Sequence, residues 1–343
     1  MKKNIVIPIV AILSGVIACL GVFAAGFIID HRVPNFSRTK VLYVYPETTA
    51  AQVADSLSDI VIRSRSLSRA FRKEDVAGRI KPGRYQVDPS NSSIYVARML
   101  SSGWQTPCRL VLSGTLRDKG TIARRISGQM MVDSAAVASA LIDGDILGKY
   151  GFSPRTVFAL FMPDTYEMYW TASVEEILER QKAEYDAFWT DENKKKAEAL
   201  GLSQMEVSIL ASIVNGESNY EPEFPKIAGV YLNRLRKGMK LQADPTVAFC
   251  FDYKLNRVLN RHLTVDSPYN TYLHEGLPPG PICVPTKASL NAVLNPDRHG
   301  YLFFCASPDF NGSHRFAVTL QEHSRNAREF QAALNARSKN KGK

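Results

Sequence analysis

The sequence lacks the short motifs that mark several kinds of chemical site. It has no C-x-x-C pair, no H-E-x-x-H, no Gly-rich phosphate loop and no complete G-x-S-x-G, because Val111-Leu112-Ser113-Gly114 lacks the first glycine. Five of the 6 histidines lie between His262 and His323, but no two are spaced like zinc ligands on a helix. We therefore expect neither a metal ion nor a cofactor.

A strong excess of charge on the folded part is also missing. The net charge of the 343 residues is +10, from 43 Lys and Arg against 33 Asp and Glu. Six of these positive charges lie at the two ends of the chain, on Lys2, Lys3, Arg337, Lys339, Lys341 and Lys343. No basic patch interleaved with aromatic residues remains, which argues against nucleic-acid binding. A hydrophobic content of 45% excludes a wholly disordered or collagen-like chain.

Cysteine is scarce, with only 5 residues in the chain, which excludes a small disulfide-stapled domain. Cys19 lies in an apolar run near the N-terminus. The other four allow three pairings, and the sequence does not choose among them. A disulfide between Cys283 and Cys305 and buried free thiols remain alternatives for this group, which comprises Cys108, Cys250, Cys283 and Cys305.

One long apolar run stands at the N-terminus. Ile5 to Ile29 contains 25 residues without a charge, which as a helix crosses the apolar core of a bilayer, about 30 Å thick. Lys2 and Lys3 precede it, so the positive-inside rule predicts a cytoplasmic N-terminus and a folded part outside the cytoplasm. A cleaved signal peptide is the alternative, since Ala24 and Ala25 are small. The apolar regions of signal peptides are usually shorter, at about 7–15 residues.

Beyond this anchor, expected over residues 1–30, and a stalk over 31–40, the pattern predicts a small β-α-α-β-α unit over 41–105. Its strands are Val41–Pro46 and Arg84–Val87, and Thr49 caps its first helix. The order resembles the βααβ of LysM peptidoglycan-binding modules. Residues 106–200 are expected to form a second strand-helix unit ending in one connecting helix over Glu175–Leu200.

The segment 201–333 holds the most informative pattern, and a basic tail is expected over 334–343. Ser203 and Glu206 form a capping box that starts a helix. Leu210, Ile213, Val214 and Glu217 lie at helical offsets of 0, 3, 4 and 7, which places the Glu217 carboxyl in line with the apolar stripe. Desolvation and the helix dipole both raise its pKa there, which suits a proton donor. The alternative is that Gly216 ends the helix and leaves Glu217 in water.

A second helix opens at Pro225 and closes at Lys237-Gly238, with Tyr231 among the residues of its buried face. Pro245 then predicts an extended loop at Asp244. Two later stretches, Ser267–Tyr272 and Gly276–Pro281, are rich in hydroxyl, amide and ring groups, which suit sugars. Ordinary structural loops have a similar composition.

Several ordered stretches closely resemble the endolytic murein transglycosylases of the YceG-like family. Upstream, Met162–Tyr166 resembles the family's F-P-D-T-Y. The other matching stretches, in order, are Ala211–Ser218, Val230–Leu235, Gly238–Val247, Ser267–Tyr272, Gly276–Pro279, Pro281-Ile282, Ala292–Pro296, Tyr301–Phe304 and Glu322-His323. The resemblance implies an α+β protein with an N-terminal transmembrane helix, a small LysM-like βααβ subdomain and a mixed α/β catalytic domain.

The resemblance also implies a function. It predicts a single-pass enzyme of the inner membrane, with its catalytic domain in the periplasm, that cuts the MurNAc-GlcNAc β-1,4 bond within nascent peptidoglycan strands, leaves 1,6-anhydroMurNAc ends and so terminates glycan elongation. Its partners would be glycan strands, the membrane and glycan-polymerising proteins. The family's catalytic glutamate maps onto Glu217. We expect further sugar contacts or orienting groups among Gln242, Asp244, Thr246, Tyr269, Asn270 and Tyr272.

Two departures from the family pattern concern the site. Asn215 replaces an acidic residue and is expected to alter the field at Glu217, and Phe158-Ala159 replaces Glu-Gly and is expected to remove a carboxylate from the groove. Two other functions stay open. A peptidoglycan hydrolase would add a base such as Asp244 or Glu221, and a non-catalytic wall-binding scaffold would not need Glu217.

Overall fold

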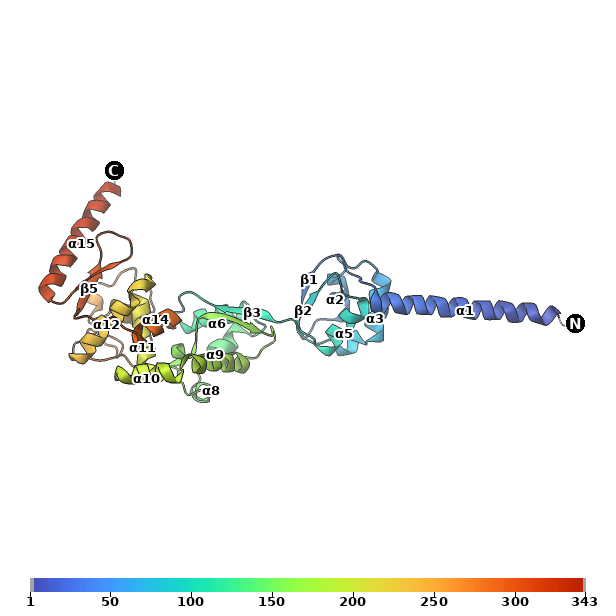
Figure 1. The fold of residues 1–343 in the computed structure, drawn as a ribbon, viewed down its shortest axis with the longest axis horizontal. Helices are drawn as coiled ribbons and strands as arrows, with labels where there is room; N and C mark the ends of the chain where they lie inside the picture. The colour runs from blue at the N-terminus through green and yellow to red at the C-terminus, as the bar shows by residue number, and fades with distance from the viewer. Residues whose placement is uncertain (1–2, 342–343) are drawn as a thin grey trace. The chain divides into compact units, whose positions relative to one another are not determined.

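The computed structural model describes residues 3–341, with side chains over 13–337, so Lys2 and the last two residues of the basic tail lie outside the described part. The chain divides into two compact units. The first runs to Leu110 and includes Glu167–Ala172, and the second comprises Val111–Tyr166 and the chain from Ser173 onward. Figure 1 gives the order of the elements along the chain. The expected mixture of helices and strands is confirmed.

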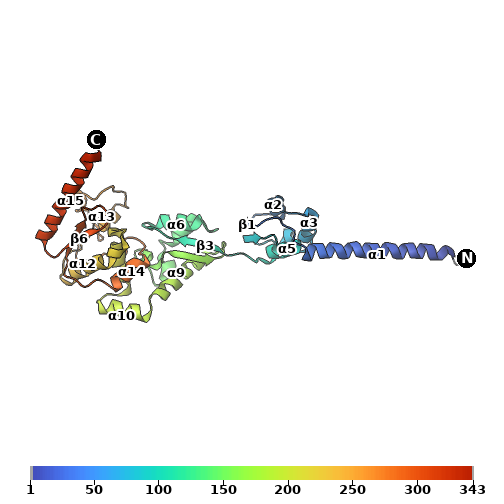
Figure 2. The same ribbon diagram turned by 45° about the horizontal axis from the view of Figure 1, so that its top comes forward.

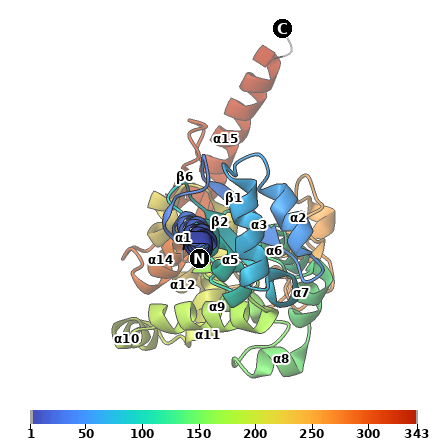
Figure 3. The same ribbon diagram turned by 90° about the vertical axis from the view of Figure 1, so that its right-hand side faces the viewer.

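Helix α1 (Lys3–Arg32) contains the apolar run. Its portion Leu13–Arg32 is, among the described residues, the one unbent helix that is long and apolar enough to cross a membrane. The end of α1 is tied to the rest of the first unit, because Asp30 forms an ion pair with Arg69 at 2.7 Å and accepts a hydrogen bond from Ser66 at 2.6 Å. Figure 3 shows α1 beside α3 (Ser64–Lys73) and α5 (Ser93–Ser102) of this unit.

The residues expected to form a stalk instead belong to the fold of the first unit. Phe36 is 2% exposed and Asn35 is 1% exposed. The Asn35 amide donates to the Arg63 carbonyl at 3.1 Å and to Ser93 Oγ at 2.8 Å. The sequence reading was wrong here, because a polar composition does not reveal that a short segment fills a gap in a core.

The first unit has the predicted β-α-α-β-α order with one additional short helix. Strand β1 (Lys40–Val44) pairs antiparallel with β2 (Gly83–Val87), with Lys40 opposite Val87. Between them lie α2 (Ala50–Ser56), α3 and the short α4 (Val76–Arg79), and α5 follows β2. The predicted cap of α2 is confirmed as a capping box of Thr49 and Gln52.

Strands β3 (Cys108–Leu112) and β4 (Asp164–Met168) form a two-stranded sheet, and the second unit begins at Val111 of β3. Between them lie the short helices α6 (Lys119–Ser127), α7 (Ser134–Ala140), α8 (Gly144–Gly148) and η1 (Val157–Leu160). The expectation of one connecting helix over Glu175–Leu200 is wrong. The structure has α9 (Val174–Phe188) and α10 (Asp191–Ala199), because Trp189 turns into the core and Thr190 caps the second helix.

The remainder of the second unit packs α11 (Gln204–Glu217), α12 (Phe224–Arg236) and α14 (Lys287–Leu294) against one another (Figure 1). The hairpin of β5 (Phe303–Ala306) and β6 (His314–Ala317) packs against α15 (Leu320–Lys341), as Figure 2 shows. Shorter helices stand between these elements: η2 (Glu221–Glu223), α13 (Asp244–Cys250) and η3 (Asn260–His262).

Two expectations from the sequence concern this region, namely an extended loop at Asp244 and a disulfide between Cys283 and Cys305. The prediction of an extended loop at Asp244 is wrong, because Asp244 begins helix α13. Pro245 lies in the first turn of this helix, where its missing N–H costs no helical hydrogen bond. Cys283 and Cys305 carry thiols rather than a shared disulfide. The buried Cys283 thiol donates to the Ser212 carbonyl at 3.4 Å.

Candidate active site

Glu217 is the last residue of α11. The predicted capping box starts this helix, with Ser203 Oγ accepting from the Glu206 amide at 3.2 Å and the Glu206 carboxylate accepting from the Ser203 amide at 2.8 Å. The apolar stripe is buried as expected, and Ile213 is fully enclosed. Glu217 is partly exposed at the end of this stripe. Helix α11 therefore places the Glu217 carboxyl on the wall of a pocket, next to the buried core.

Gly216 does not release Glu217 into water, since α11 continues through both residues. A Cβ on Gly216 would lie 2.7 Å from Cβ of Pro245, which is closer than two carbon atoms can pack. Glycine is therefore needed for α11 to approach the first turn of α13. This approach brings Asp244 to the same pocket as Glu217.

The Glu217 carboxyl is held by a hydrogen bond that the Tyr231 hydroxyl donates to Oε1. Tyr231 lies on α12, is 2% exposed and packs its ring against Phe304 of β5, with 5.9 Å between the ring centroids. Burial and the adjacent carboxylate raise the pKa of Tyr231 well above its ordinary value, so its hydroxyl remains a donor. The sequence placed Tyr231 on a buried face but did not reveal this contact.

Burial raises the pKa of Glu217 from 4.5 to about 7. The hydrogen bond from Tyr231 opposes this shift, the negative charge of Asp244 adds to it, and the Arg234 guanidinium opposes it. Desolvation dominates because it penalises only the ionised form. Near neutral pH the group therefore exists in both protonated and ionised states.

Asp244 and Tyr272 form a second polar pair in the pocket. The Tyr272 hydroxyl donates to Asp244 Oδ1 at 2.7 Å. Gln242 precedes this pair in a left-handed backbone conformation with φ of +50°, which is uncommon for a residue with a side chain. Its backbone N–H donates to the Thr271 carbonyl at 3.1 Å. The loop thus has a defined shape where it meets the pocket.

Arg234 also lines the pocket and organises part of its wall, although the sequence did not identify it. Its buried guanidinium donates to the carbonyls of Leu302 at 2.6 Å, Leu241 at 2.8 Å and Lys240 at 3.2 Å. It also lies 5.1 Å from the centre of the Phe303 ring. One side chain of α12 therefore joins the 240–242 loop to the start of β5.

These groups surround a pocket of about 460 Å³. Three of the predicted substrate-binding residues, Gln242, Asp244 and Tyr272, line it together with Glu217. The sequence reading missed the contribution of the β5–β6 hairpin and of the start of α15. The residues that it missed are Tyr231, Arg234, Leu241, Phe303, Phe304, Cys305, Ala306, His314, Leu320 and His323.

The other three predicted contacts do not line this pocket. Thr246 and Asn270 are both 0% exposed. The Thr246 hydroxyl donates to the Ala243 carbonyl at 2.7 Å, and the Asn270 amide donates to the carbonyls of Leu263 and Val265, each at 2.9 Å. Tyr269 packs its ring on Phe249. Thr246 and Asn270 therefore hold the loops in place, because their polar groups are used within the protein, whereas Tyr269 contributes through its ring contact.

The two departures from the family pattern also lie outside the pocket. Asn215 accepts a hydrogen bond from the Thr286 hydroxyl at 3.1 Å and donates to Cys283 Sγ at 3.8 Å, so it faces the start of α14. Phe158 and Ala159 lie in η1 and are 5% and 1% exposed. This position is therefore in the core and does not line the pocket, and the loss of a groove carboxylate through this departure stays a prediction.

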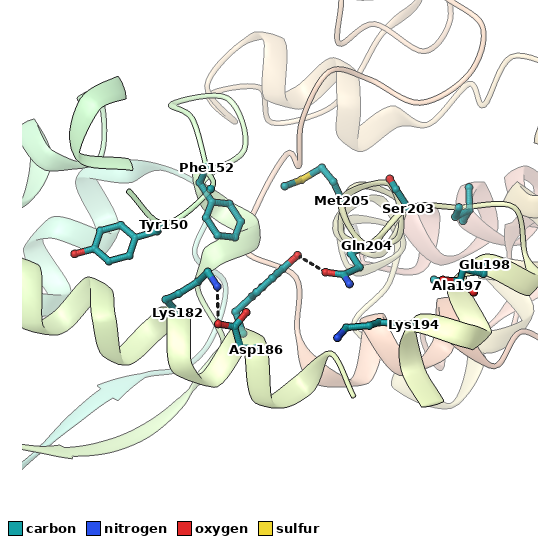
Figure 4. A pocket seen from close by; sticks show the side chains of 13 residues that line it. Tyr150, Phe152, Lys182, Asp186, Lys194, Ala197, Glu198, Ser203, Gln204 and Met205 are labelled. Atoms are coloured by element: carbon teal, nitrogen blue, oxygen red, sulfur yellow. Dashed lines mark hydrogen bonds and ion pairs between the residues drawn. The ribbon is translucent and has the colours of Figure 1, made fainter. Parts of the chain in front are cut away.

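A larger cavity of about 610 Å³ lies between the loop after α8, helices α9 and α10, and the start of α11. Figure 4 shows Tyr150, Phe152 and Lys182 on its wall. The two dashed contacts are the ion pair of Lys182 with Asp186 and the 3.5 Å bond from Tyr185 to Gln204. None of the predicted site residues lines this cavity, and its two lysines, Lys182 and Lys194, pair with Asp186 and Asp191.

Within the part of the chain that the structure describes, no three His, Cys, Asp or Glu residues are arranged to hold a metal ion. The chemistry available in the pocket is proton transfer by Glu217, together with orientation by Tyr231, Asp244 and Tyr272. A carboxyl with a pKa near 7 can donate a proton and take one back at the same pH.

Residues 42–329 match the model of the YceG-like family. The chain belongs to this family. A segment that covers 48% of it is 37% identical over 166 residues to an endolytic murein transglycosylase of Bacillus subtilis, and covers 44% of that relative. A segment of 49% is 27% identical over 176 residues to one of Streptococcus pneumoniae, and covers 31% of it. These matches therefore span less than half of the length of either curated relative.

A solved structure is also similar. The crystal structure of a putative YceG-like protein from Listeria monocytogenes superposes with a TM-score of 0.54 and 26% sequence identity, covering 84% of this chain and 99% of the other. The family and the fold thus agree with the resemblance read from the sequence. Membership of the family makes glycan cleavage the first hypothesis for the pocket around Glu217.

Proposed function

We propose that this protein is a lytic transglycosylase that cleaves peptidoglycan strands internally, with Glu217 as its acid and base. The observation that carries this proposal is a carboxyl with a pKa near 7 on the wall of a pocket, held by a tyrosine that stays protonated. The names of the curated relatives support the same reaction class.

The reaction needs only one carboxyl. Protonated Glu217 gives its proton to the oxygen that joins C1 of MurNAc to C4 of GlcNAc, and the C1–O bond breaks with its electron pair going to that oxygen. Positive charge develops at C1. The ionised Glu217 then takes the proton from the C6 hydroxyl of the same MurNAc, whose oxygen bonds to C1 and closes a 1,6-anhydro ring. The attacking oxygen is already tethered to the reacting sugar, so no water is consumed.

A hydrolase would use the same acid but would need a second carboxylate to activate water. Asp244 lines the pocket, but its Oδ1 already accepts the Tyr272 hydroxyl. Glu221 lies exposed in η2 and does not line the pocket. These contacts favour the single-carboxyl route. A scaffold that only binds glycan would gain nothing from the raised pKa of Glu217.

The anchor and the first unit fit the same function. In this proposal α1 is a single span of the inner membrane with its N-terminus in the cytoplasm, and the pocket faces the periplasm. The βααβ unit acts as a LysM-like glycan-binding module. This arrangement would keep the enzyme near membrane-bound glycan-polymerising proteins, where nascent strands emerge and their elongation could be terminated.

Digestion of purified peptidoglycan in water enriched in oxygen-18 tests the reaction. The proposal predicts 1,6-anhydroMurNAc ends without the label, because water takes no part in bond formation. Reducing ends that carry the label would instead identify a hydrolase. Mass spectrometry of the released fragments distinguishes the two outcomes in a single sample.

A further inference from the structure

A second pocket adjoins the first at Glu217. It has a volume of about 560 Å³ and shares three residues with the first pocket, namely Glu217, Ala306 and His314. Its remaining wall comes from the segment after α11, from the loop between β5 and β6, and from α15. The Glu217 carboxyl therefore lies between two hollows.

The β5–β6 hairpin forms part of both pockets. Residues 303–306 of β5 line the first pocket, and its last residue, Ala306, and the loop after it line the second. The hairpin is fixed beside Glu217, because the Glu223 carboxylate accepts from the His314 amide at 3.0 Å and from His314 Nδ1 at 2.9 Å. The two pockets thus have a rigid common wall.

Two exposed aromatic side chains lie in the second pocket. Tyr220 is 44% exposed and Phe310 is 37% exposed. Phe310 has a φ of +54°, a costly conformation for a residue with a bulky side chain. Its ring lies 5.8 Å from the Phe330 ring and 4.7 Å from the Arg337 guanidinium. The loop thus keeps an aromatic ring at the pocket against the backbone preference.

The polar groups beside these rings suit a sugar. The loop provides the side-chain NH2 group of Asn311, whose Oδ1 accepts from the Ser313 hydroxyl at 2.6 Å. The residue after α11 provides the Ser218 hydroxyl, which accepts from the Tyr220 backbone amide at 2.9 Å and can still donate. A pyranose ring has apolar C–H faces that stack on aromatic rings and equatorial hydroxyls that bond to amides and hydroxyls. The second pocket offers both kinds of group next to the proposed acid.

We infer that the second pocket binds the glycan on the opposite side of the scissile bond from the first pocket, with Phe310 and Tyr220 as stacking surfaces. The inference rests on the proposed function, since it takes Glu217 to mark the bond that breaks. A strand that passes from one pocket to the other places an internal bond at Glu217. The pair of pockets thus accounts for internal rather than terminal cleavage.

The test measures binding apart from chemistry. Peptide-free glycan strands are titrated against the full-length Glu217→Gln protein with and without a change at Phe310. Phe310→Gly removes the ring and suits the φ of +54°, and it is expected to weaken binding about three- to tenfold. Phe310→Trp keeps a ring and is expected to bind like its parent.

Matched variants keep the test decisive. Tyr150→Ala removes a partly exposed ring of the same unit that lines neither of these pockets, and it should bind like its parent. If Phe310→Gly lowers the unfolding temperature enough to confuse the comparison, Tyr220→Ala decides, with the same expected loss. Unchanged binding in the folded ring-deleted variant overturns the inference. Failure of the proposed function would appear separately, as cleavage that does not need Glu217.

Discussion

The Tyr231 hydroxyl of α12 donates a hydrogen bond to Oε1 of Glu217 at the end of α11. This contact has two effects on the carboxyl. It fixes the direction in which Glu217 presents its proton, and it stabilises the ionised state that burial disfavours. The pKa of Glu217 near 7 is the balance of these opposing effects, so changes in its neighbours should move it in directions that can be stated in advance.

Tyr231→Phe should raise the pKa of Glu217, because the ionised carboxylate loses a hydrogen bond. The upper limb of the pH–rate profile is expected to move about one unit to higher pH, since a bond to a charged group contributes about 1.5–3 kcal/mol. The maximal rate should fall about tenfold because the carboxyl is no longer oriented. Tyr253→Phe, which removes a hydroxyl bonded to the Ile282 carbonyl, is the matched control. An unshifted upper limb in Tyr231→Phe would contradict this role.

Asp244→Asn should have the opposite effect on the pH–rate profile. The negative charge of Asp244 raises the pKa of Glu217, so its removal should move the upper limb to lower pH. Because Asp244 has no proton to transfer in the single-carboxyl route, we expect the maximal rate to remain within about tenfold of the wild type. A loss of activity as severe as that of a Glu217 variant would indicate that Asp244 is the base of a hydrolase.

The stability of the fold should also report the state of Glu217. Its pKa is raised from 4.5 to about 7, so the folded state binds its proton more tightly than the unfolded state does. The contribution of this group to stability is therefore fully present below about pH 4.5 and is lost as the pH rises through about 7.

Glu217→Gln removes this dependence while keeping an oxygen that accepts from Tyr231. Relative to the wild type, the variant should gain about 2 kcal/mol of unfolding free energy between pH 5 and pH 8. Urea unfolding of both proteins at the two pH values measures this difference. If the variant and the wild type differ by the same amount at both values, Glu217 does not titrate with a raised pKa.

Gly216→Ala should damage the site without touching a polar group. The new methyl group would meet Pro245 at 2.7 Å and force α13 away from the end of α11. We expect a loss of about 1–3 kcal/mol in stability and a loss of activity larger than that loss explains, because Asp244 moves relative to Glu217. Gly148→Ala in α8 is the control, since nothing lies within 4 Å of its added carbon. Equal effects of the two changes would exclude the packing role of Gly216.

The sequence predicted well those features that depend on neighbouring residues. The helix cap at Thr49, the capping box at Ser203 and the position of Glu217 in line with a buried stripe follow from residue type and helical spacing alone. The contact of Glu217 with Tyr231 could not be predicted from the sequence, because it joins two helices whose relative orientation depends on the whole core.

The errors have a common physical origin. Thr246 and Asn270 looked like sugar contacts because they are polar, but the loops use these side chains to satisfy their own backbone groups. The stalk was expected because its composition is polar, yet Asn35 and Phe36 are buried. Residue type indicates what a side chain can bond, whereas only the fold decides whether its partner is the protein or a ligand.

The most direct test of the account compares full-length wild-type protein with Glu217→Gln on purified peptidoglycan below pH 7. Both proteins are first shown to have the same unfolding temperature within the shift expected from the charge alone. Mass spectrometry then counts 1,6-anhydroMurNAc ends against time. We predict internal anhydro ends from the wild type and almost none from the variant. Anhydro ends forming at the wild-type rate in Glu217→Gln would contradict the assignment of Glu217 as the acid.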